Sequence, residues 1–328
     1  MTNDLVQHQS FQSWPTAVAT ASPAAWHTIL QFFAAEIRNA NTRRAYLHAV
    51  EDFFRFAGGI PGGEGLSTIT SLHVSAWIEF LARSGQSAPT IKQRLAALRM
   101  LFQSLARERI IAINPASVVR GPKHIVRRGK TPVLTAEEAR QIMDAVDTST
   151  LVGLRDRALI ATMVYSFARI GAVCALKVED VFTAQRRLWL RLTEKGGKQV
   201  EIPCHHTLED YLSAYIEAAG LQTSPRAPLF QTTFRNGARA NGQRSLSGNP
   251  ISQPIAWAIM QRRVAGTGIS TEICNHTWRA TGITTYLKAG GTIERAAAIA
   301  NHSSTRTTQL YDRRPDDITL DEIERIQI

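Results

Sequence analysis

Apolar residues recur every three or four positions through much of the first 110 residues, with polar and basic residues between them. From residue 41 to residue 59, one such stripe holds Tyr46, Ala49, Val50, Phe53 and Ala57. A second stripe, between residues 88 and 111, holds Ile91, Leu95, Leu98, Phe102 and Leu105. This spacing is typical of amphipathic helices that bury one face. We therefore expect a small, all-helical bundle over residues 25–120.

The pattern after residue 132 is also mainly helical, with one exception. Thr135 and Glu138 form a capping box ahead of a helix, and further helices are expected within 154–181, 207–219, 255–264 and from 277 onward. Between residues 188 and 202, leucines alternate with Trp189 and Arg191, the pattern breaks at two glycines, and alternation then resumes, which predicts a β-hairpin. The predicted fold is mostly α, with an N-terminal helical bundle and a mainly α C-terminal domain that carries a small antiparallel β-sheet.

The charge of the chain narrows the class of partner. Lys and Arg number 38 against 27 Asp and Glu, a net charge of +11, and such an excess favours nucleic acid or an acidic membrane surface. No apolar run approaches the ~18 residues of a membrane span, and the N-terminus lacks the pattern of a signal peptide. The isolated cysteines Cys174, Cys204 and Cys274 indicate neither a zinc site nor a disulfide framework. We expect a cytoplasmic protein with no membrane association.

A basic, irregular segment separates the two helical regions. Residues 120–130 hold five lysines and arginines, no acid, two glycines and one proline, and the proline disfavours helix in the residue before it. We expect a linker over 121–132, which either is a solvated connector or also contacts the phosphates of a duplex. Residues 1–24 are rich in Thr, Ser, Ala and Gln and are expected to form a flexible tail, which leaves 25–120 and 133–328 as the two domains.

The candidates for chemistry lie in the C-terminal domain and are Arg169, Lys195, His276, Arg279, His302 and Tyr311. Arg169 occurs in an apolar stretch, and a buried arginine needs an anionic partner. Lys195 precedes two glycines at the tip of the predicted hairpin, where a phosphate can approach closely. His276 and Arg279 share a helix face at i and i+3, and Tyr311 comes nine residues after the second histidine.

Together these residue types suit transesterification at a phosphodiester. Arginine presents planar, paired donors to phosphate oxygens. Lysine and histidine can exchange protons with the attacking and leaving oxygens, and tyrosine can form a covalent intermediate. No cluster of acids and histidines with metal-ligand spacing is evident, so we expect neither a metal nor another cofactor.

Four stretches resemble motifs of the tyrosine recombinases, or phage integrases, and in particular of their Xer-like members. They are ARIGAVCALKVEDV, EKGGKQVEIP, HTWRATGITTYLKAGG and ANHSSTRTTQLY. The stretches NTRRAYLHAVEDFFRFA and APTIKQRLAALRMLF resemble the family's N-terminal core-binding domain, a SAM-like helical bundle. Two positions depart from the family pattern: residues 166–168 are Ser-Phe-Ala where Thr-Gly-Leu is usual, and Ala280 stands where a histidine usually follows the second arginine.

The resemblance implies a role for each candidate. Tyr311 would attack a DNA phosphate and form a 3′-phosphotyrosyl link, while the two arginines would bind the non-bridging oxygens. His276 would assist the proton transfer of the tyrosine, and His302 would hydrogen-bond the phosphate. Lys195 would protonate the departing 5′-oxygen, with Lys198 as the alternative lysine.

The implied function is site-specific recombination of double-stranded DNA through a Holliday junction, in integration, excision or resolution. A transposase or a hairpin-forming resolvase would use the same chemistry. A non-catalytic DNA-binding protein of the same fold is a further alternative, against which the complete set of six candidates argues. Candidate DNA-contacting residues are Arg43, Arg44, Lys92, Arg94, Arg99, Lys123, Arg127, Arg128 and Lys130.

The C-terminal segment reverses the charge of the rest of the chain. Residues 312–328 hold six acids and three arginines, and Leu320, Ile323 and Ile326 fall on one helical stripe. A helix over about 316–328 could pack on its own domain. The resemblance implies instead that it docks into a neighbouring subunit and links a tetramer around two DNA sites.

Overall fold

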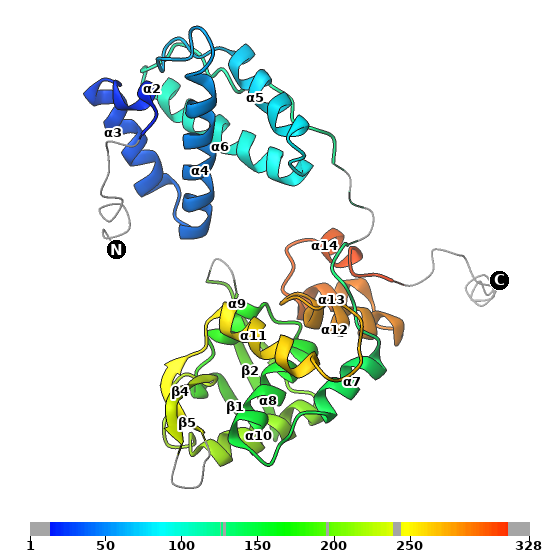
Figure 1. Ribbon diagram of the computed structural model, residues 1–328. Helices are drawn as coiled ribbons and strands as arrows, with labels where there is room; N and C mark the ends of the chain where they lie inside the picture. Colours follow the sequence, from blue (N-terminus) through cyan, green and yellow to red (C-terminus); the bar gives the residue numbers. More distant parts are fainter. Residues whose placement is uncertain (1–13, 125, 127–128, 195–196, 239–243, 314–328) are drawn as a thin grey trace, which may run out of the picture. The chain divides into compact units, whose positions relative to one another are not determined.

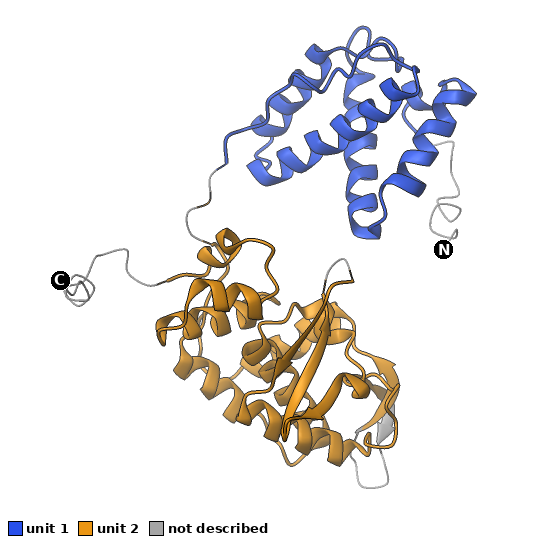
Figure 2. Ribbon diagram, turned by 180° about the vertical axis from the view of Figure 1, so that it is seen from behind, with its two compact units in different colours: residues 1–125 blue, residues 126–328 orange. Residues whose placement is uncertain are grey.

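The computed structural model describes residues 14–124, 126, 129–194, 197–238 and 244–313. The chain forms two compact units, residues 1–125 and 126–328 (Figure 2). The boundary between the units falls inside the segment 121–132 that the sequence marks as a linker. Both units are mainly helical, and small antiparallel sheets occur in the second, which confirms the predicted fold class.

The first unit is a bundle of helices (Figure 1). In chain order these are α2 (Thr16–Ala19), α3 (Pro23–Gln31), the π-helical turn η2 (Phe32–Glu36), α4 (Ala40–Ala57), α5 (Ser71–Arg83) and α6 (Ala88–Arg107). The predicted stripes meet at the centre, where Phe53 of α4 packs edge-on against Trp77 and Phe102, at centroid distances of 5.3 and 5.9 Å. The side chains of Asn39 and Ser87 cap α4 and α6, so each helix begins where an acceptor is available for its free N–H groups.

The expected flexible tail over residues 1–24 is wrong from Trp14 onward. The Trp14 ring packs edge-on against Trp26 at 5.6 Å, and Ala17 and Val18 of α2 are buried in the core of the bundle. Ser22 caps α3 by accepting the backbone N–H of Ala25. The segment is ordered by these few contacts, which a composition of small and polar residues does not reveal. Residues 1–13 lie outside the described part.

The second unit is built around α8 (Figure 1). Its elements are α7 (Ala136–Asp144), α8 (Leu151–Ser166), α9 (Ile170–Cys174), η3 (Val178–Asp180), β1 (Val181–Ala184), β2 (Arg187–Thr193), β3 (Gln199–Pro203), α10 (His206–Ala219), β4 (Gln231–Ala238), β5 (Arg244–Pro250), α11 (Gln253–Val264), α12 (Thr277–Lys288), α13 (Ile293–Ile299) and α14 (Thr305–Gln309). Helix α8 is buried on most of its faces, as expected for a central helix, and α10 and α12 pack against it. Among the helices that the structure describes, none combines the length and the apolar character needed to cross a membrane.

Two antiparallel sheets lie in this unit. The predicted hairpin is present as β2 and β3, with Leu190 opposite Ile202, and β1 adds a third strand that the sequence pattern did not show. The second sheet, which the sequence pattern also did not show, consists of β4, which runs to Ala238, and β5, which begins at Arg244. These strands carry mostly polar residues, such as Thr232 and Ser247, whose hydroxyls lie 2.5 Å apart, so no apolar alternation marks them.

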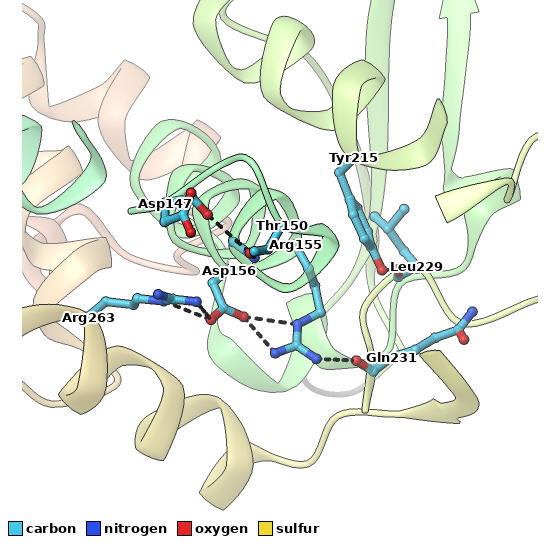
Figure 3. Close-up of polar contacts among 9 residues, drawn as sticks. Asp147, Thr150, Arg155, Asp156, Tyr215, Leu229, Gln231 and Arg263 are labelled. Carbon is cyan, nitrogen blue, oxygen red and sulfur yellow. Dashed lines mark hydrogen bonds and ion pairs between the residues drawn. The ribbon is translucent and has the colours of Figure 1, made fainter. Parts of the chain in front are cut away.

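A buried ion network ties the second sheet to the helical core (Figure 3). Asp156 of α8, which is 1% exposed, accepts hydrogen bonds from Arg155 at 2.9 and 2.7 Å and from Arg263 of α11 at 2.9 and 2.7 Å. Arg155 also donates to the carbonyl of Gln231 at 2.8 Å, where β4 begins. Since each charge is paired, the network fixes α8, α11 and β4 to one another, and removal of one partner would strand a buried charge.

Candidate active site

Arg169 lies in the short turn between helices α8 and α9. Helix α8 ends at Ser166, its C-cap Phe167 has a left-handed backbone with φ 53° and ψ 22°, and Arg169 is the N-cap of α9. The turn packs closely on Gly282 of α12, because a Cβ there would lie 2.0 Å from the carbonyl oxygen of Val164. Glycine at this position therefore allows α12 to approach the end of α8. The Arg169 side chain is left 34% exposed.

Glu194 is the anionic partner that Arg169 requires. It lies just after β2 with its side chain 4% exposed, and its Oε2 is 2.5 Å from Nη1 of Arg169. Its other oxygen accepts the backbone N–H of Arg169 at 3.3 Å and lies 3.9 Å from Nη1 of Arg279. Glu194 is not among the site residues predicted from the sequence. The available signal was an acid beside Lys195 at the end of a predicted strand, in a domain that holds an arginine in need of a counter-charge.

Arg279 is buried at the centre of the cluster, with 1% exposure. Its guanidinium donates to the carbonyl oxygens of Phe167 and Ala300, the latter at 2.7 Å, and Nη2 lies 2.7 Å from Nε2 of His302. Burial, together with the charge of Arg169, lowers the pKa of Arg279 to about 10, so the group still carries its charge at neutral pH. A fixed, partly desolvated cation of this kind is suited to binding an anion.

The two candidate histidines are neutral at neutral pH. Burial, and then the charges of Arg279 and Arg169, lower the pKa of His302 to about 4. Because Nε2 of His302 accepts from Arg279, its Nδ1 carries the hydrogen and donates to Oγ1 of Thr308 at 2.8 Å. Partial burial of the ring and the same two arginines also lower the pKa of His276. The His276 side chain, at the start of α12, has no hydrogen-bond partner within the described part of the chain.

Tyr311 lies against the same cluster. Its ring is nearly parallel to that of His302, with centroids 5.9 Å apart and an interplanar angle of 10°. Thr284 of α12 donates to the backbone carbonyl of Tyr311 at 2.8 Å. The structure thus brings together Arg169, His276, Glu194, His302 and Tyr311 around Arg279. No group of three or more acids, histidines or cysteines among the described residues is arranged to hold a metal ion.

Three other positions named from the sequence have different outcomes. Lys195 lies outside the described residues. Lys198 is exposed, and its backbone carbonyl accepts the N–H of Glu194 at 2.8 Å, which closes the hairpin. Ala280, which replaces the family's usual histidine, is fully buried in the interior of α12.

The candidate DNA-contacting residues divide into two groups. Three arginines of the first unit have partners within that unit. Arg43 donates to the carbonyl of Ile37, Arg94 pairs with Asp52 at 2.7 Å, and Arg99 donates to the carbonyl of Ala116 at 3.2 Å. The other candidates that the structure describes are Arg44, Lys92, Lys123 and Lys130, all of them exposed, and Arg127 and Arg128 lie outside the described residues.

Comparison with known proteins identifies relatives for both units. Residues 132–316 match the Phage integrase family, and residues 31–109 match the phage integrase N-terminal SAM-like domain. The chain is 29% identical to the tyrosine recombinase XerC of Mycobacterium sp. (strain KMS) over 278 residues, which are 84% of this chain and 88% of that protein. It is 29% identical to the tyrosine recombinase XerD of Corynebacterium glutamicum over 296 residues, 88% of this chain and 91% of that protein.

Solved structures show the same fold. The chain superposes on a lambda integrase dimer bound to a COC′ core site with a TM-score of 0.67 and 19% identity, covering 92% of this chain and 100% of that chain. For the XerH site-specific recombinase bound to palindromic difH substrate, the TM-score is 0.66 at 16% identity, covering 96% of this chain and 90% of that chain. The likeness extends through both units.

Proposed function

The chain belongs to the phage integrase family as a Xer-like tyrosine recombinase, an enzyme that cleaves and rejoins DNA, and from this premise we propose that Tyr311 is its nucleophile and Arg279 the centre of its phosphate site. The observation that carries the proposal is the position of His302, which is hydrogen-bonded to Arg279 and parallel to Tyr311. A phosphate bound to this arginine lies beside the phenol that would attack it.

In the proposed step, the phenolic oxygen of Tyr311 forms a bond to phosphorus, and the bond from phosphorus to the 5′-oxygen breaks. The guanidiniums of Arg169 and Arg279 stabilise the charge that builds on the non-bridging oxygens. The product is a 3′-phosphotyrosyl link with a free 5′-hydroxyl. Because one phosphoester replaces another, rejoining can run as the reverse attack without a nucleotide cofactor.

The hydrogen bonds separate the roles of the two histidines. Both ring nitrogens of His302 are engaged, one by Arg279 and one by Thr308, which suits a fixed group that orients the arginine and the phosphate. His276 is neutral and has no such partner in the described residues, so it can accept the proton that the phenol of Tyr311 loses. The resemblance assigns protonation of the 5′-oxygen to Lys195.

The biological outcome we propose is exchange between two specific sites on double-stranded DNA. Lambda integrase has been solved as a dimer on a core site and as a tetramer bound to a Holliday junction, and we propose a tetramer on DNA for this chain also. Residues 316–328 would form the helix that docks into a neighbouring subunit. Their apolar stripe and acidic charge support this, because an acidic helix suits a basic protein surface better than DNA.

The test is a covalent-adduct assay on a nicked candidate site, in which the cleaved end diffuses away and the phosphotyrosyl product accumulates. The wild-type chain should give a denaturation-resistant protein–DNA band in the presence of EDTA. Tyr311→Phe should give none and should bind DNA as before, since only the attacking oxygen is removed. Tyr286→Phe is the matched control, because Tyr286 packs in the same small apolar cluster. Adducts formed by Tyr311→Phe would place the nucleophile elsewhere.

A further inference from the structure

The end of the linker runs beside the segment that carries Tyr311. The backbone N–H of Gly129 donates to the carbonyl oxygen of Leu310 at 2.9 Å. In the opposite direction, Nη2 of Arg313 donates to the carbonyl oxygens of Gly129 at 2.5 Å and Thr131 at 3.3 Å. The linker is therefore bonded one residue before and two residues after the tyrosine.

The approach at Gly129 is too close for any other residue. A Cβ at this position would lie 2.5 Å from the Leu310 carbonyl oxygen, and that oxygen belongs to backbone that cannot rotate away. The linker and the tyrosine segment are therefore in direct backbone contact. A larger residue at 129 would have to displace the chain just before Tyr311.

The tyrosine segment has little support of its own. Helix α14 is five residues long, Thr305–Gln309, and a helix of this length is not stable without packing. Past its end, the N–H groups of Tyr311 and Asp312 donate back to Thr308 and Gln309 at 2.9 and 3.1 Å. Bonds from outside also reach this backbone: Thr284 of α12 donates to the Tyr311 carbonyl at 2.8 Å, and the linker bonds to Leu310 and Arg313.

We propose that Gly129 and Arg313 are positioning residues that form a brace between the linker and the nucleophile segment, and that the place of the Tyr311 hydroxyl depends on the path of the linker. The inference rests on the proposed role of Tyr311 as nucleophile. The linker leads directly to the first unit. Through the brace, the position of the Tyr311 hydroxyl therefore depends on how the first unit binds DNA. Neither brace residue is among those proposed to bind the phosphate.

The brace is tested with the full-length chain on the nicked site, by the single-turnover rate of adduct formation at saturating protein and by the Kd from gel shift. Arg313→Ala and Gly129→Ala should each lower the rate tenfold or more while the Kd stays within about twofold. Arg313→Lys should recover part of the rate, since an ammonium can still donate to one carbonyl. Gly121→Ala is the matched linker control, because a Cβ there would meet only side-chain atoms of Leu95 and Lys92 at 3.4 Å.

The outcomes separate the brace from the function on which it rests. If the wild-type chain forms adducts and both alanine variants match its rate, the brace is wrong and the role of Tyr311 stands. If adducts also form in Tyr311→Phe, the proposed nucleophile itself is wrong. The positioning role would be overturned if the two alanine variants melt at so low a temperature that unfolding accounts for the lost rate. It would also be overturned if Gly121→Ala loses the same rate, because either result would show general damage to the chain.

Discussion

The carboxylate of Glu194 is paired with the guanidinium of Arg169, with 2.5 Å between Oε2 and Nη1. Within the described residues, Nη1 is the only side-chain nitrogen of Arg169 that donates to protein. The remaining donors of the guanidinium are therefore free to bind a phosphate while Glu194 holds the group in place. The same carboxylate is 3.9 Å from Arg279, so one buried acid holds Arg169 in place and offsets the positive charge of both arginines.

Glu194→Gln should lower the rate of DNA cleavage by about 10- to 100-fold, because a hydrogen bond to a charged group contributes roughly 1.5–3 kcal/mol. Glutamine keeps the shape of the side chain and removes its charge. The rate is measured as single-turnover adduct formation at saturating protein. Glu201→Gln on the same hairpin, which loses only an exposed pair with Arg191, is the control and should match wild type. Equal rates for both variants would show that the buried charge is not needed.

The two arginines should differ in what their removal does to stability. Arg169→Ala and Arg279→Ala should each reduce cleavage by about 100- to 1,000-fold, the usual cost of losing one transition-state donor. Arg169 is one-third exposed, so its loss should change the melting temperature little. Loss of the buried Arg279 strands the carbonyls of Phe167 and Ala300 and should lower the free energy of unfolding by roughly 3 kcal/mol or more. The stability of both variants is measured by thermal and urea unfolding. Equal losses of stability in the two variants would contradict this prediction.

The sequence predicts those parts of this molecule in which one face of an element is buried. The stripes of α4 and α6 and the alternation of β2 are of this kind, because burial on one face leaves a period in the sequence. Strands β4 and β5 have no such period, since polar residues form them and the buried Asp156 network fixes them to the core. Likewise, α2 is ordered by the packing of Trp14 on Trp26, a contact that composition does not encode.

The candidate site shows a similar division. Arg169, Arg279 and Tyr311 attract attention in the sequence because each residue type is chemically unusual where it occurs. Glu194 is not recognisable as a site residue in the sequence, because an acid at the end of a hairpin is ordinarily exposed. Its burial depends on Arg169, a partner 25 residues away. The contact of Gly129 with Leu310 could not be predicted from the sequence for the same reason, because only folding brings these two residues together.

The stability of the second unit should fall as the pH is lowered from about 6.5 toward 4. In the folded chain the pKa of His302 is about 4, whereas an unfolded histidine titrates near 6.5. Between these values the unfolded state binds more protons, so stability is fully present above about 6.5 and is lost at lower pH. For His302 alone, the loss between pH 7 and pH 5 is at most about 2 kcal/mol.

His302→Gln, which cannot titrate, should show a shallower decline of melting temperature with pH than the wild-type chain. Some slope should remain, because burial also lowers the pKa of His276 and of His205. Melting is followed from pH 7.5 to pH 5 in buffers of constant ionic strength. Parallel curves for the two proteins would mean that His302 is protonated equally in the folded and unfolded chains.

Deletion of residues 315–328 should leave the binding of one subunit to DNA intact and remove the association between subunits. The removed segment is acidic, so it does not contribute to phosphate contacts, and Arg313 of the brace is retained. The shortened chain should bind a single-arm site with unchanged affinity and form some adduct, but lose cooperative binding on a two-arm site and recombination between sites. Ile323→Asp, on the apolar stripe, should reproduce the defect, and Glu322→Gln, off the stripe, should not. Cooperativity that survives the deletion in gel-shift titrations would show that the segment packs on its own domain and that another surface joins the subunits.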